Sequence, residues 1–95
     1  MSKAKERADV LRDVAERASL LNEFRSDDFQ DRVVRIVYGA RELWRDKDGE
    51  LPRPGTDLGF DVLMDLLGAA DSSPLTFRDA ASRVLRAADG AKASR

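Results

Sequence analysis

The sequence predicts an all-α protein, a compact single domain arranged like a four-helix bundle. Three observations predict this class: apolar residues recur at helical spacing in four segments, no segment alternates as a strand would, and the connections between segments are short. The 95 residues have the length of one domain. We expect helices at about 3–24, 27–47, 57–70 and 76–90, followed by a frayed tail at 91–95.

An apolar stripe predicts the first helix. Its members recur at intervals of three and four residues: Val10, Leu11, Val14, Ala15, Ala18, Leu21 and Phe24. Asp13 and Arg17, four residues apart on the other face, support the same helix by about 0.3 kcal/mol. Leu20 falls outside the stripe, on the polar side.

The second helix begins with a pair that resembles a capping box, Asp27 and Gln30. Its buried stripe is then expected to contain Phe29, Val33, Ile36, Val37, Ala40, Leu43 and Trp44. We expect the helix to end near Lys47, with Gly49 available as a left-handed cap.

The third helix has an unusual composition, DLGFDVLMDLLGAA, and is expected to begin at Thr56 or Asp57. Asp57, Asp61 and Asp65 lie on one narrow strip, which we interpret as a solvent-facing ridge. Apolar residues occupy most of the remaining surface. A helix this apolar is expected to be central in its domain or to be covered by a partner.

The fourth helix has a clear start signal at Thr76, which is followed by Asp79 three residues later and preceded by Leu75. This pattern predicts Thr76 as the capping residue. We expect Gly90 to end the helix.

Composition excludes several classes of activity. The chain contains neither cysteine nor histidine, which removes thiolate chemistry and both the commonest general base and the commonest transition-metal ligand. Ser72 and Ser73 therefore have no histidine to activate them, and no glycine-rich phosphate loop is present. We expect a protein that is not an enzyme and has no cofactor. No apolar run reaches the length of a membrane span or a signal peptide, so the expected location is the cytoplasm.

The segment RDKDGELPRPG at residues 45–55 contains part of a calcium-loop pattern. Aligning Gly49 with the sixth position of an EF-hand loop places Trp44 at the first ligand position and Gly55 at the twelfth. Neither residue supplies a side-chain oxygen, although the twelfth position needs a bidentate glutamate. We therefore expect a helix end and a proline-stiffened crossover, and no calcium binding.

Interaction surfaces give the strongest functional signal. Val34 and Tyr38 lie opposite the apolar stripe of the second helix, with Arg41 and Arg45 beside them, and protein interfaces are enriched in such mixtures. On the third helix, Phe60 and Met64 are further candidates. The sequence thus favours a non-enzymatic protein–protein interaction module, such as an adaptor, an inhibitor or a regulatory or accessory subunit, whose partner is another protein or a second copy of the chain.

The alternative is a nucleic-acid-associated regulator. Although the net charge is −1, residues 76–95 hold five basic and two acidic side chains. Arg83, Arg86, Lys92 and Arg95 could contact phosphates there. The segment lacks the Asn or Gln residues that commonly read bases from the first turn of a recognition helix, so a protein partner is preferred.

Overall fold

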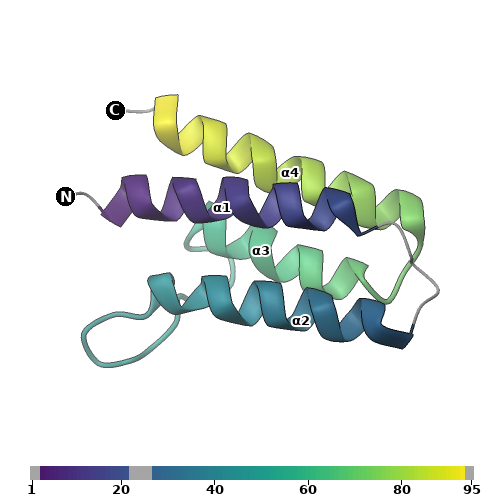
Figure 1. The fold of residues 1–95 in the computed structure, drawn as a ribbon. Coiled ribbons are helices and arrows are strands. Elements are labelled where there is room, and N and C mark those ends of the chain that lie inside the picture. Colours follow the sequence, from purple (N-terminus) through teal and green to yellow (C-terminus); the bar gives the residue numbers. More distant parts are fainter. Residues whose placement is uncertain (1–2, 22–26, 94–95) are drawn as a thin grey trace.

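The computed structural model describes residues 3–21 and 27–93, and the elements in these ranges are all helical (Figure 1). The elements are α1 (Lys3–Leu20), α2 (Asp27–Arg41), the 3₁₀ turn η1 (Glu42–Trp44), α3 (Leu58–Ala69) and α4 (Pro74–Ala93). The predicted all-α class is confirmed.

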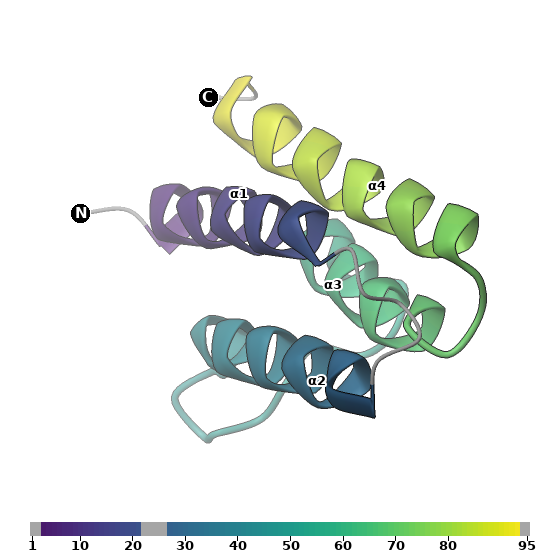
Figure 2. The same ribbon diagram turned by 45° about the vertical axis from the view of Figure 1, so that its right-hand side comes forward.

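Successive helices alternate in direction, so that α1 and α4 lie side by side and antiparallel (Figure 1). The third helix contacts α1, α2 and α4, as expected of a helix that is apolar nearly all round. Figures 1 and 2 both show α1 and α4 diverging toward the chain termini. The start of α3 lies near this same end of the bundle (Figure 1).

The core contains buried apolar residues from all four helices, including most of the described members of the two predicted stripes on α1 and α2. Its most deeply buried large side chains are Leu11, Val33, Val37, Leu63, Leu66 and Val84. At the end of the bundle where α2 and α4 begin, the rings of Phe29 and Phe77 meet edge to face, with their centroids 4.9 Å apart. Leu20 is 78% exposed, as its position outside the stripe predicted.

No helix in the described ranges has both the length and the apolar character needed to cross a membrane.

The second helix ends earlier than predicted. It stops at Arg41, and the 3₁₀ turn that follows leaves Trp44 only 3% exposed. Residues 45–47 are not helical because the Asp46 carboxylate accepts hydrogen bonds from the backbone N–H groups of Asp48 (2.8 Å) and Glu50 (3.0 Å). Such a local side-chain turn competes with helix continuation. Gly49 does have a positive φ of 80°, but it closes this turn and does not cap α2.

The second helix begins at Asp27, as predicted, and the Gln30 side chain has a tertiary partner that the sequence did not indicate. The amide of Gln30 donates to the Asp71 carboxylate at 2.7 Å, which links the start of α2 to the α3–α4 connection. The first helix ends at Leu20, earlier than the predicted end near Phe24, and the Leu21 N–H donates to the Ala18 carbonyl at 3.1 Å in a tighter final turn. Phe24 itself lies outside the described residues.

The fourth helix begins earlier and ends later than predicted. Thr76 is not the cap, because the Ser73 hydroxyl accepts the Thr76 N–H at 3.1 Å and the Ser73 carbonyl accepts the Phe77 N–H at 2.9 Å. Pro74 then occupies the first helical position, where its missing N–H costs nothing. Gly90 does not end the helix, which continues to Ala93, so residues 91–93 of the predicted tail are helical.

We predict that Ser73→Ala destabilises the fold by about 1 kcal/mol, because it removes the cap of α4. The matched control is Thr76→Ala, which removes only an exposed hydroxyl–hydroxyl contact of 2.9 Å and is expected to change stability by less than about 0.5 kcal/mol. Urea denaturation measures both. A larger loss for Thr76→Ala than for Ser73→Ala would contradict this assignment of the cap.

Candidate functional site

The predicted surface on α2 is only partly open. Tyr38 is 43% exposed, while Val34 is half-buried. The Arg41 guanidinium lies 3.9 Å from the centroid of the Tyr38 ring, a cation–π contact that covers one face of the ring. Tyr38 and Arg41 therefore form one unit, which reduces the aromatic surface left for a partner.

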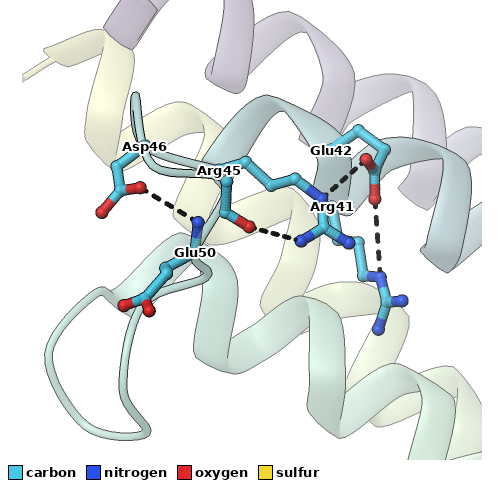
Figure 3. Close-up of polar contacts among 6 residues, drawn as sticks. Arg41, Glu42, Arg45, Asp46 and Glu50 are labelled. Carbon is cyan, nitrogen blue, oxygen red and sulfur yellow. Dashed lines mark hydrogen bonds and ion pairs between the residues drawn. The ribbon is translucent and has the colours of Figure 1, made fainter.

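Arg45 has a structural role that the sequence did not indicate. Its guanidinium donates to the Glu42 carboxylate and to the Gly49 carbonyl, both at 2.7 Å (Figure 3). The hydrogen bond from Arg45 lowers the pKa of Glu42, and the charges of Arg45 and Arg41 act in the same direction. The Arg45 side chain therefore links the 46–50 turn to η1. Its guanidinium is used in these bonds, although the sequence predicted that Arg45 would belong to the interaction surface around Val34 and Tyr38.

The two candidates on α3 have different environments. Phe60 is 6% exposed and belongs to the core, so the expectation that it forms part of an open surface is wrong for this structure. Met64 is half-buried and packs against that core. Neither residue adds a large exposed apolar area to the predicted surface.

Two of the predicted nucleic-acid residues line a groove that the sequence did not reveal. Arg83 and Arg86 of α4 border an open hollow of about 790 Å³ between the diverging ends of α1 and α4, closed on its third side by the start of α3. Lys92 falls at a position whose side chain lies outside the described part of the chain, and Arg95 lies beyond residue 93. We call this hollow the arginine groove, lined by Arg7, Ala8, Leu11, Trp44, Thr56, Asp57, Leu58, Gly59, Val62, Arg83, Arg86, Ala87 and Gly90.

Arg7 joins the two arginines of α4 from the opposite wall. Its Nε donates to the Leu43 carbonyl at 3.1 Å, and its guanidinium carbon lies 5.4 Å from the centroid of the Trp44 ring. The sequence carried a signal for this position, because Arg7, Leu11, Val14 and Ala18 follow one helical stripe. An arginine within an apolar stripe marks the point where the stripe leaves the core.

The end of the groove is shaped by Asp57, which caps α3. Its Oδ1 accepts the Phe60 N–H at 3.0 Å and the Trp44 indole N–H at 3.1 Å. Gly59 allows the close approach: a Cβ at this position would lie 3.2 Å from both Leu11 Cδ1 and Trp44 Cζ2. The start of α3 is therefore held against α1 and η1.

The expected ridge of three carboxylates does not exist as a unit. Asp57 caps α3 and accepts the Trp44 indole N–H. Asp61 accepts the Gly55 N–H through both carboxylate oxygens, at 3.0 and 3.1 Å. Of the three side chains, Asp65 is exposed, and Asp57 and Asp61 are half-buried. The described residues contain no group of three or more acidic side chains placed to hold a metal ion.

In the 46–50 turn, the Asp46 carboxylate accepts a hydrogen bond from the backbone N–H of Glu50, which Figure 3 shows. The absence of calcium binding by this loop stays a prediction.

Comparisons with protein-family models, with curated proteins and with solved structures give no match to the chain.

We predict that Asp57→Ala destabilises the fold by about 2 kcal/mol, since it removes a helix cap and leaves the Trp44 indole N–H without its acceptor. Asp57→Asn is the matched control, because its carbonyl oxygen can accept both hydrogen bonds, and it should cost less than half as much. Urea denaturation followed by Trp44 fluorescence measures the two changes. Equal losses for both variants would show that charge, and not the acceptor, is what matters at this position.

Proposed function

We propose that this chain is a non-enzymatic protein–protein interaction module that binds its partner in the arginine groove. The observation that supports the proposal is a hollow with an apolar floor and arginines on two walls. Leu58 is 70% exposed on its rim, and Val62 and Ala87 lie within it. Apolar surface bordered by arginine is characteristic of binding surfaces, where arginine is enriched and the buried centre is apolar.

The arginine groove is preferred to the surface on α2 because it contains an arginine that has no ion pair with a described residue. On α2, Arg41 is stacked on Tyr38, and Arg45 is bonded to Glu42 and Gly49. In the groove, Arg86 is exposed and makes no ion pair with a described residue. An adaptor, inhibitor or accessory subunit acting in the cytoplasm would use such a surface without any chemistry of its own.

A nucleic-acid-associated role is the second candidate, favoured by one observation. Arg83 and Arg86 lie one turn apart on α4 and share the groove with Arg7, so three guanidinium groups border one site. Phosphate groups bind arginines arranged in this way. The apolar floor between the arginines gives a phosphate backbone nothing to contact, which is why a protein partner is preferred.

The proposed function is tested by quantitative affinity purification from an extract of the source organism. We expect proteins retained by the wild-type chain to be depleted at least tenfold by Leu58→Ser and by Arg86→Glu. Their controls are Leu75→Ser and Arg35→Glu, which alter exposed residues of the same types that do not line the groove.

Retention of the same proteins by all four variants would contradict the proposal. Loss with Tyr38→Ala and not with the groove variants would assign the binding site to α2 instead. Denaturation curves of each variant show whether the fold is intact.

A further inference from the structure

The floor of the arginine groove is apolar, and most of its exposed surface belongs to one side chain. Leu58 stands at its edge with 70% of its surface exposed, although it begins a helix whose other large side chains are mostly buried. Val62 and Leu11 lie deeper, with 7% and 2% exposed. One or two apolar side chains from a partner would remove this surface from water at about 25 cal/mol per Å².

The groove also has an excess of positive charge. Of its three arginines, only Arg83 has an ion pair with a described residue, the exposed Asp79 at 3.3 Å. The one acidic residue of the lining, Asp57, already accepts two hydrogen bonds. The charge of the groove is therefore opposite in sign to the net charge of −1 of the chain.

The α4 wall of the groove is long enough to contact a short helix. Its wall on α4 runs from Arg83 to Gly90, which is two helical turns or about 10 Å. Gly90 has no side chain, and a Cβ built there would meet nothing within 4 Å. A partner backbone can therefore approach α4 closely at this point, as amphipathic helices do when they bind in a groove between helices.

We propose that the arginine groove binds an acidic amphipathic helix of another protein. Apolar residues of that helix, four positions apart, pack on Leu58 and on the small exposed part of Val62, and its flanking carboxylates pair with Arg86 and Arg83. The inference rests on the proposed function and adds the chemistry of the partner. Charge complementarity selects this occupant, because an apolar helix without acidic residues would leave the arginines unpaired against it.

The test is a selection of 16-residue peptides from a random displayed library on the immobilised full chain. We expect the selected peptides to be enriched in Asp and Glu around apolar residues spaced four apart. Synthetic copies are then titrated, and binding is followed by the fluorescence of Trp44, the single tryptophan of the chain, which borders the groove.

Three variants give the expected pattern of affinities. Arg86→Glu weakens binding at least tenfold, and replacing an acidic peptide residue by Lys restores part of the loss. Gly90→Leu adds a side chain to the lining at a position where a Cβ meets nothing within 4 Å, and it weakens binding at least tenfold. Arg35→Glu, an exposed arginine on α2, changes the affinity less than twofold.

The contrary outcomes separate the inference from the proposed function. If Gly90→Leu abolishes binding but Arg86→Glu has no effect, the groove binds protein but the partner is not acidic, and the inference is overturned alone. If no peptide is selected, or if Gly90→Leu has no effect on binding, both the inference and the proposed function are overturned.

Two further measurements test other occupants of the groove. A sub-micromolar complex with a 20-base-pair DNA duplex that Arg83→Ala and Arg86→Ala abolish would assign the groove to nucleic acid. A dimer in solution that Gly90→Leu converts to a monomer would assign it to a second copy.

Discussion

A single carboxylate oxygen connects three parts of this small fold. Asp57 Oδ1 accepts one hydrogen bond from the first turn of α3 and another from the indole of Trp44, at the end of η1. Trp44 in turn lies beneath Arg7 of α1. Because the connection from residue 45 to residue 57 has no regular structure, the position of the start of α3 depends on this contact and on the packing around Gly59. The end of the bundle where α1 and α4 diverge is fixed by the same group of residues.

The arginine groove follows from that placement. α1 and α4 diverge, and the start of α3 closes the space between them but does not fill it. Leu58 is left on the rim because it follows the cap directly, at a position that points away from the core. Arg83 and Arg86 border the hollow from α4, and Arg7 borders it from α1. A structural contact in the crossover thus produces a surface with both apolar and positively charged groups.

The sequence was sufficient for the fold class and for most of the core, because helical periodicity depends only on neighbouring residues. The ends of the helices were harder to predict, since they depend on competing side-chain hydrogen bonds. The side-chain hydrogen bonds of Asp46 prevent the helix from continuing after Trp44, and Ser73 caps α4 in place of Thr76. In both cases a hydrogen bond from a backbone N–H group to a short polar side chain decides where the helix begins or ends.

The arginine groove could not be predicted from the sequence because its residues come from separate helices. Arg83 and Arg86 were identified from local charge, but the groove requires Arg7, more than seventy positions earlier, and Leu58 from a third helix. Periodicity gives the face of each helix and does not give the angle between two helices. Phe60 was misplaced for a similar reason: on a helix that is apolar on nearly all sides, the sequence does not show which side is covered.

The role of Asp57 is tested most directly by hydrogen exchange of the Trp44 indole N–H, observed as one resonance in a ¹⁵N–¹H spectrum. If the hydrogen bond to Asp57 holds the crossover in place, this proton exchanges at least a hundredfold more slowly than in a free indole. The same resonance loses its protection in Asp57→Ala and keeps it in Asp57→Asn. Exchange at the rate of a free indole in the wild-type protein would contradict the central position of this contact.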